Sequence, residues 1–302
     1  MSKIKFVILF ILNALFWGAS FLAIHYSINV FSPFFAAQLR VIIALLFIFI
    51  LILFEKKKSF KHPYWFQSCL LGILSIGLPW ALLFWGETIV SPAVAAILNS
   101  SVPVLVVLMA PLMTPKDGFS VKKLIGVCFG FIGIACVFFP DLKFGKMTLY
   151  TQGMIAIMLM AISYAIGILW TRRISKHLDN QLNLFYNLLG SVLFLNVMII
   201  IQNQPVIINP ITPQSVFAVL YLGIFSSALA LLIFFKIIKE VGSVQASAVT
   251  FMVPLIAIVL DLIFLGKGLN YFQSLGAGFI FVSLFIINHQ TKKSKNIIAK
   301  DS

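Results

Sequence analysis

Charged residues are scarce in this sequence, and acidic residues are scarcest of all. Only 10% of the 302 residues are charged, with eight Asp and Glu against 22 Lys and Arg, whereas 61% are hydrophobic and the mean hydropathy is +1.09. A water-soluble domain of this size needs many more polar side chains to cover its surface. The composition therefore excludes a soluble globular protein and indicates an integral membrane protein whose partner is the lipid bilayer.

Cysteines, histidines and common catalytic motifs are also few or missing. The three cysteines, Cys69, Cys128 and Cys136, lie within apolar runs without a CxxC pair, so neither a disulfide framework nor a metal site is predicted. The four histidines lie at or beyond the ends of apolar runs, and no cofactor is expected. The absence of HExxH, GxSxG and Walker motifs makes a membrane-embedded enzyme a distant alternative and excludes direct use of ATP by this chain.

Long apolar runs are what the sequence does contain. A bilayer core of roughly 30 Å takes about 20 helical residues to cross. Lys3 and Lys5 precede the first run, but it is too long for a signal peptide and no A-x-A site follows it, so we expect an uncleaved helix. We predict an all-α integral membrane protein with ten transmembrane helices, near residues 6–24, 34–54, 65–85, 92–113, 121–139, 152–170, 181–201, 215–235, 244–265 and 271–289.

Basic residues gather in alternate connections between these runs. Nearly all Lys and Arg residues lie at the two ends of the chain or in the second, fourth, sixth and eighth connections. Because positively charged loops stay in the cytoplasm, both termini are predicted to be cytoplasmic, in a bacterial cytoplasmic (inner) membrane. The net charge of +14 is spread over these turns, so no nucleic-acid partner is expected, and the basic turn at 55–61 is interpreted as a lipid anchor.

The chain repeats itself. Residues 90–113 and 241–264 align at an offset of 151 residues, which places Pro254 on Pro103. Both stretches begin with small residues, carry polar side chains one turn before the proline, and lead into a short turn and another apolar run. Such internal similarity indicates one structural unit used twice.

The other helices support the same division. At an offset of 147 residues the first two helices align with the sixth and seventh, which places Tyr164 on Trp17 and Asn187 on Arg40. A unit of five helices is an odd number, so the second unit enters the membrane inverted relative to the first. Inverted repeats place a binding site at their interface near the midplane. The predicted units are therefore 1–142, 143–291 and a basic tail, 292–302.

Arg40 is the one basic residue predicted well inside a helix. A central Arg costs roughly 2.5–3.5 kcal/mol on insertion scales. Arg40 is therefore expected to face a cavity, where its planar cation would bind a substrate carboxylate. The alternatives are that its side chain snorkels to the outer interface or braces Glu87.

Polar residues precede both repeated prolines. Asn99 stands about one turn before Pro103, and Thr250 one turn before Pro254. Because proline donates no backbone hydrogen bond, we predict that both helices are interrupted there, with the polar side chains lining a cavity wall and the prolines acting in gating. The alternative is hydrogen bonding between helices, worth about 0.6 kcal/mol on average.

Aromatic and amide residues complete the predicted substrate-binding set. Trp17 lies in mid-helix on the same face as Asn13, and Tyr164 is its repeat partner, so the two aromatic residues are expected to stack with substrate. Trp80 and Asn187 are further candidates. The alternative for the aromatic pair is packing alone.

Two carboxylates lie in or beside the outer half of the predicted membrane region. Asp261 and Glu87 are the candidates for carrying a coupled proton, because burial favours the neutral form of a carboxyl group. The alternative is that both lie at the outer interface in water.

These features together resemble a known family. Trp17-Gly18, Arg40, the two small-residue helices with their prolines, and Asp117 shortly before LIGVCFGFIG are similar to the drug/metabolite transporter superfamily of EamA type. The resemblance implies two EamA repeats, with a central cavity formed by helices one to four and six to nine. Helices five and ten would stand outside as a scaffold or homodimer surface. The sequence departs from the family pattern at Lys267, where a Glu is usual, which puts the local hairpin structure in doubt.

The resemblance also implies a function. Members move small metabolites, often amino acids or toxic compounds, and commonly outward. We therefore expect a secondary transporter that moves a small-molecule substrate by alternating access, with export favoured. An uptake permease or exchanger of the same fold is the alternative.

Overall fold

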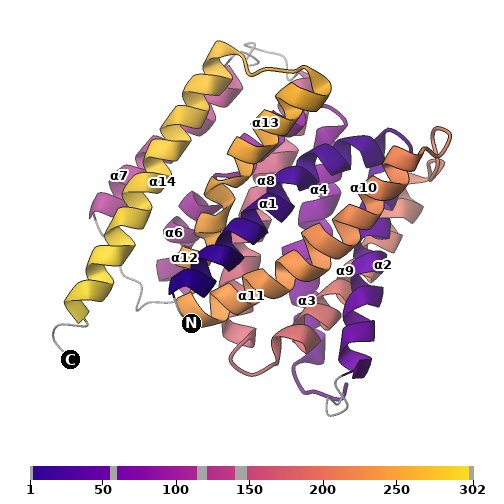
Figure 1. Ribbon diagram of the computed structural model, residues 1–302, viewed down its shortest axis with the longest axis horizontal. Coiled ribbons are helices and arrows are strands. Elements are labelled where there is room, and N and C mark those ends of the chain that lie inside the picture. Colours follow the sequence, from indigo (N-terminus) through magenta and orange to yellow (C-terminus); the bar gives the residue numbers. More distant parts are fainter. Residues whose placement is uncertain (1–2, 55–59, 114–120, 140–147, 299–302) are drawn as a thin grey trace.

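A computed structural model describes residues 3–54, 60–113, 121–139 and 148–298 (Figure 1). Within these ranges the regular elements are helices, and one isolated β-bridge joins Phe31 to Ile207. The all-α class predicted from the sequence is therefore confirmed. Asp117, the basic residues at 55–59 and the expected unit boundary at 142 lie outside the described residues.

The helices follow the apolar runs closely. Ser91, Asp179 and Thr212 each begin a helix by accepting a hydrogen bond from a backbone N–H of the first turn. The helices are α1 (Lys3–Ile28), α2 (Pro33–Phe54), α3 (Trp65–Gly72), α4 (Leu78–Glu87), α5 (Pro92–Asn99), α6 (Val102–Met113), α7 (Val121–Phe138), α8 (Leu149–Ile174), α9 (Asn180–Gln202), α10 (Pro213–Gly223), α11 (Ala230–Val241), α12 (Ser243–Ser247), α13 (Val253–Leu265) and α14 (Tyr271–Ile298).

Seven helical stretches in the described ranges are long and apolar enough to cross a membrane. Each of the ten predicted runs coincides with helix, but the count of ten crossings remains a prediction. Large apolar side chains cover the outside, for example Phe54 at 80%, Ile200 at 75% and Phe217 at 72% exposure. Such a surface is suited to lipid and not to water. The seven stretches are Phe6–Ile28, Pro33–Phe54, Trp65–Glu87, Pro92–Pro111, Leu149–Ile174, Asn180–Gln202 and Pro213–Val241.

Two of these stretches contain a π-helical segment. Segment η1 (Ile73–Gly77) joins α3 to α4, and η3 (Ile224–Leu229) joins α10 to α11. The extra residue in such a turn leaves backbone carbonyls without their usual partners, and π-helical turns often occur at functional sites. The two segments lie at corresponding positions of the sequence repeat.

Two further helices are interrupted where the repeated prolines occur. Helix α5 ends at Asn99, and α6 resumes at Val102, immediately before Pro103. In the second half, α12 leads through the 3₁₀ segment η4 (Ala248–Phe251) to α13, whose second residue is Pro254. Proline suits the first turn of a helix because its missing N–H would be unpaired there in any case.

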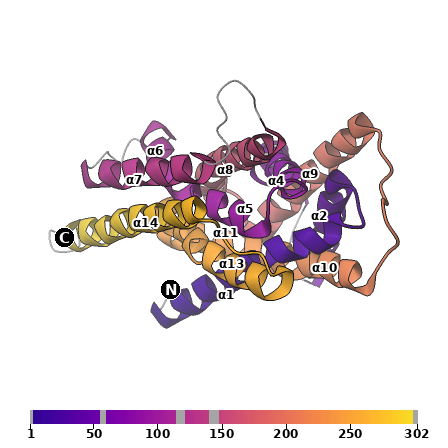
Figure 2. The ribbon, with the colours of Figure 1, turned by 90° about the horizontal axis from the view of Figure 1, so that it is seen from above.

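The interrupted helices pack against each other. Helix α5 contacts α13, while α6 contacts α12 and η4. The first half of one interrupted helix thus lies against the second half of the other, as in two antiparallel helices that cross. Helices α7 and α14 pack side by side along one edge of the molecule (Figures 1 and 2).

Glycines allow the closest helix contacts, and they do so in the same way in both halves. A Cβ atom on Gly72 would lie 2.0 Å from the carbonyl oxygen of Asn187. A Cβ atom on Gly223 would lie 2.4 Å from Ile43 and 3.3 Å from the carbonyl oxygen of Arg40. Gly223 corresponds to Gly72 in the repeat, and Asn187 corresponds to Arg40. In each half, a glycine thus lets one helix approach the backbone of another at corresponding positions of the repeat.

The glycines of α7 serve packing within the chain. A Cβ atom on Gly133 would lie 2.7 Å from the carbonyl oxygen of Gly276 in α14, and the hydroxyl of Ser283 donates to the carbonyl oxygen of Gly126 at 2.5 Å. The homodimer expected through the fifth and tenth helices would therefore use their other faces. Those faces expose Phe131 and Phe285.

Candidate binding cavity

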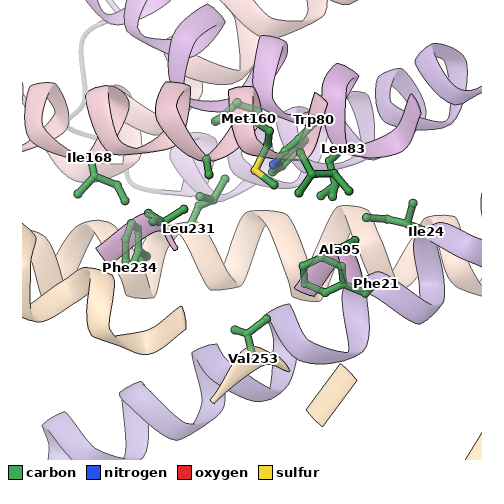
Figure 3. Packing of buried hydrophobic residues seen from close by; sticks show 14 of the residues in the cluster. Phe21, Ile24, Trp80, Leu83, Ala95, Met160, Ile168, Leu231, Phe234 and Val253 are labelled. Carbon is green, nitrogen blue, oxygen red and sulfur yellow. The ribbon is translucent and has the colours of Figure 1, made fainter. Parts of the chain in front are cut away.

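A cavity lies between the two halves of the chain. Its volume of about 50 Å³ holds a few water molecules, so a larger molecule requires the cavity to widen. Apolar side chains that line it, among them Phe21, Leu83 and Phe234, come from separate helices (Figure 3). Its polar and aromatic lining consists of Trp17, Ser20, Arg40, Ser75, Asn99, Tyr164, Thr171 and Thr250.

Arg40 is the positively charged group of this cavity. Its Nε donates to Ser227 Oγ at 2.7 Å, and its Nη2 donates to Ser226 Oγ at 3.0 Å and to the Ser226 carbonyl oxygen at 3.3 Å. Its guanidinium carbon lies 3.7 Å from the centroid of the Trp80 ring. These contacts fix the plane of the guanidinium and leave Nη1 without a hydrogen bond to any described residue.

The contacts decide between the alternatives considered for Arg40. The residue is only 2% exposed, so its side chain does not reach the outer interface. Within the described ranges no carboxylate forms an ion pair with it, Glu87 included. Its partners are hydroxyls, a carbonyl and an aromatic face, which desolvate the cation without neutralising its charge. Arg40 is therefore a cavity-facing cation that lacks a bonded anion.

Three aromatic side chains are linked to Arg40 directly or through its partners. The indole N–H of Trp80 donates to the hydroxyl of Tyr164. The indole N–H of Trp17 donates to the carbonyl oxygen of Ser226 at 3.2 Å, and its ring meets Phe234 edge-on at 4.8 Å. Trp17 and Tyr164, which the repeat pairs, thus line the same cavity. Trp80 is adjacent, beneath Arg40.

The interrupted helices supply the polar residues of another wall. The Thr250 hydroxyl donates to the carbonyl oxygen of Ser247 at 2.8 Å, which satisfies an acceptor beside the interruption. The side chain of Asn99 forms no hydrogen bond with the described residues, although it is only 8% exposed. Asn99 can therefore donate to or accept from a bound molecule. Pro103 and Pro254 each stand in the first turn of the helix that resumes after the interruption, outside the cavity lining.

Asn187 lies outside the cavity lining. Its amide donates to Ser68 Oγ at 3.1 Å and accepts from Ser75 Oγ at 3.0 Å, and it also bonds Asn183 one turn earlier. This network holds α9 against α3 and η1. The Ser75–Asn187 bond is the repeat counterpart of the Arg40–Ser226 bond, with an amide in place of the cation.

Asn13 also lies outside the lining. It is fully buried on α1, one turn before Trp17, and neither its oxygen nor its nitrogen bonds a described residue. It is a polar group enclosed by the helices behind Trp17.

The two carboxylates differ sharply in their surroundings. Asp261 is 1% exposed, and its Oδ2 accepts a hydrogen bond at 3.2 Å from the backbone N–H of Ala93. Ala93 stands in the first turn of α5, where unpaired N–H groups and the helix dipole favour an anion. Glu87 ends α4, is 4% exposed, and neither of its oxygens is hydrogen-bonded in the described residues. Both carboxylates are thus enclosed by protein, and not in water as one alternative held.

Ser226 and Ser227 were missed by the sequence analysis as site residues. They lie in η3 and provide the hydroxyls that orient Arg40. The signal was present in the repeat, because Ser226 corresponds to Ser75. Neither position reveals by itself which residue its hydroxyl meets.

An apolar helical exterior around a cavity that holds a buried arginine fits a membrane protein with an internal site for a small molecule. The family is identified by comparison with known sequences. The chain belongs to the EamA-like transporter family, whose model matches residues 4–139 and 151–289 as two repeats. The family resemblance predicted from the sequence is therefore confirmed.

Individual relatives agree. An uncharacterized transporter of Buchnera aphidicola subsp. Schizaphis graminum (strain Sg) is 28% identical over 267 residues, which are 87% of each chain. Protein PecM of Dickeya dadantii (strain 3937) is 26% identical over 275 residues, or 90% of this chain and 88% of that protein. A solved crystal structure with 16% identity superposes with a TM-score of 0.71 over 97% of this chain and 99% of that one, which supports the fold.

Proposed function

We propose that this protein is a secondary transporter that moves a small metabolite across a bacterial cytoplasmic membrane by alternating access, with the Arg40 cavity as its substrate site. The observation that carries the proposal is the guanidinium of Arg40, which lines the cavity, is held by neutral groups and has no hydrogen bond from Nη1 to a described residue. A buried cation without a bonded anion is costly unless a ligand supplies the anion.

Alternating access is supported by the way the two repeats interlock. Helix α1 contacts α11 and α13, and in return α8 contacts α4 and α6. Exchanging the repeats converts the first pair of contacts into the second, which two oppositely inserted copies of one unit would require. In such proteins, rocking one repeat against the other opens a central site to each side in turn.

The lining supports a substrate with a carboxylate and an apolar or aromatic body. Arginine binds carboxylates through parallel hydrogen bonds, and Nη1 of Arg40 is available for one of them. Trp17, Tyr164 and Phe234 offer apolar faces, while Asn99 offers both a donor and an acceptor. An amino acid or a related acid meets these conditions. An amphiphilic cation would be repelled by Arg40.

Export is the proposed direction, on the resemblance to the family. The same cavity would serve an uptake permease if the driving gradient pointed inward. The buried carboxyl group of Glu87 supports this second candidate, because a proton bound there could enter with the substrate. Transport assays in both directions distinguish the two.

Reconstitution in liposomes tests the proposal. Fluxes of radiolabelled amino acids, phenylacetate and an amphiphilic cation are measured with and without a pH gradient of either sign. We expect saturable carboxylate flux that Arg40→Ala lowers about 10- to 100-fold, because a hydrogen bond to a charged group contributes about 1.5–3 kcal/mol. The control Lys239→Ala removes an exposed cation from the end of α11. Unchanged flux in Arg40→Ala at normal membrane levels would contradict the assignment.

A further inference from the structure

We propose that Glu87 is a proton-binding site coupled to Arg40, so that a carboxylate substrate and a proton occupy the protein together and cross the membrane together. This inference rests on the proposed role of Arg40 as the anion site. It adds a proton as a second ligand, Glu87 as the residue that binds it, and a ratio of one proton to one anion.

The position of Glu87 connects it to the cavity. Trp80, Leu83 and Glu87 recur at helical spacing on one face of α4. The first lies beneath the guanidinium of Arg40, and the second lines the cavity. Glu87 follows Trp80 by seven positions, which is about 10 Å along the helix axis.

Within the described part of the chain, Glu87 lacks the hydrogen bonds that a structural carboxylate normally forms. It is 4% exposed, and both of its oxygens lack a hydrogen-bond partner in the described residues. A carboxylate that stabilises a fold is normally paired or bonded to backbone N–H groups, as Asp261 is. Ionised and without partners, Glu87 destabilises the protein; protonated, it is an uncharged group of modest cost.

The charges that act on Glu87 come from two helices. They are Arg40 on α2 and Asp261 on α13. The other titratable groups on helices packed against α4 include Tyr164 on α8, whose hydroxyl accepts from Trp80, and His25 on α1, which interacts with Asp261. Asp261 is already compensated by a helix N-terminus. The positive field of Arg40 is thus the one influence among these that favours an ionised Glu87.

Substrate binding removes that influence. A carboxylate that pairs with Arg40 neutralises its field, and the ionised form of Glu87 then lacks any compensation. A proton therefore passes from solvent to a Glu87 oxygen, no bond in the substrate breaks, and the net charge of the cavity is the same before and after binding. By linkage, a protonated Glu87 also strengthens anion binding at Arg40.

The coupling determines the direction in which a proton gradient drives transport of the substrate. Because anion and proton move together, an inward proton gradient drives uptake, whereas export proceeds on the substrate's own outward gradient. The proton gradient then opposes export of the acid.

The number of protons bound with the anion tests the coupling. Phenylacetate is titrated into the purified full-length protein by calorimetry in buffers of different ionisation enthalpy. We expect about one proton taken up per anion in the native protein and none in Glu87→Gln, whose phenylacetate affinity also loses its dependence on pH. Glu240→Gln, at an exposed carboxylate of α11, is the matched control and keeps the native proton uptake.

Each other result has a definite meaning. Anion binding without proton uptake in the native protein, or the same uptake in Glu87→Gln, overturns the coupling while leaving the Arg40 site intact. Should Glu87→Gln fail to fold, infrared difference spectra of the native protein decide, because phenylacetate must produce a new protonated-carboxyl band. Its absence overturns the proposal. If the native protein binds neither phenylacetate nor any amino acid, the Arg40 site itself fails, and the coupling fails with it.

Discussion

Arg40 of α2 donates a hydrogen bond of 3.0 Å to Ser226 of η3, which joins the first repeat to the second beside the cavity. The corresponding pair in the other half is Asn187 and Ser75, also at 3.0 Å. The same hydrogen bond thus occurs at corresponding positions of both repeats, but only the Arg40–Ser226 pair includes a charged side chain. That asymmetry places one cation, Arg40, in the cavity lining.

Removing the hydroxyls that orient Arg40 tests these contacts. In Ser226→Ala and Ser227→Ala, the guanidinium keeps its charge but loses a fixed orientation, and carboxylate affinity should fall about tenfold in each. Quenching of tryptophan fluorescence by phenylacetate measures this affinity. Ser274→Ala, at an exposed position of α14, is the control. Native affinity in both variants would show that the two serines do not orient Arg40.

Substitutions of Trp80, whose ring lies beneath Arg40, should raise KM to different extents. Trp80→Phe keeps an aromatic ring under the cation, whereas Trp80→Leu removes it. Both variants lose the indole N–H that donates to Tyr164, so their difference isolates the ring. Cation–π contacts contribute about 2 kcal/mol when desolvated, so we expect Leu to raise KM by roughly tenfold or more and Phe to raise it less. Equal KM values for the two variants would show that the ring serves only to fill space.

Close backbone contact at Gly72 should make alanine costly there. A Cβ atom 2.0 Å from the carbonyl oxygen of Asn187 forces α3 away from α9, and overpacking of this kind destabilises by about 1–3 kcal/mol. We expect Gly72→Ala to lower the Tm in detergent. Gly268→Ala, where a Cβ atom meets nothing within 4 Å, should leave the Tm unchanged. A native Tm for Gly72→Ala would mean that the helices are not held so closely.

Asp261 should behave as a cap, unlike Glu87. In Asp261→Ala the N-terminus of α5 loses its carboxylate partner, and a lost cap costs about 0.5–2 kcal/mol. The Tm should fall, while proton uptake on phenylacetate binding is retained. The reverse pattern, with a native Tm and lost proton uptake, would make Asp261 the proton site and contradict its role as a cap.

Much of the cavity could be predicted because polar residues are conspicuous in an apolar sequence. Arg40, Asn99 and Thr250 stand out among Val, Ile and Leu, and the repeat pairs Trp17 with Tyr164. All five line the cavity. The helix interruptions followed from the two prolines, since the missing N–H is a local property.

Other features depend on contacts that no local pattern encodes. The π-helical turns insert one residue without altering the apolar character of the run. A serine in a helix can bond its own backbone equally well, so Ser226 gave no sign of Arg40. Asp261 accepts a hydrogen bond from Ala93, which is 168 residues away in the sequence. The side chain of Asn187 donates a hydrogen bond to Asn183 and does not line the cavity. Only the packed helices reveal these partners.

Alternating access requires the cavity to open to each side of the membrane in turn. It is tested by placing a single cysteine at Asn99 in a chain whose three native cysteines are replaced, and labelling it with a membrane-impermeant maleimide in right-side-out and inside-out vesicles. Alternating access predicts labelling from both sides, slowed by phenylacetate in both. Labelling from neither side, or from one side alone whatever the substrate, would contradict it.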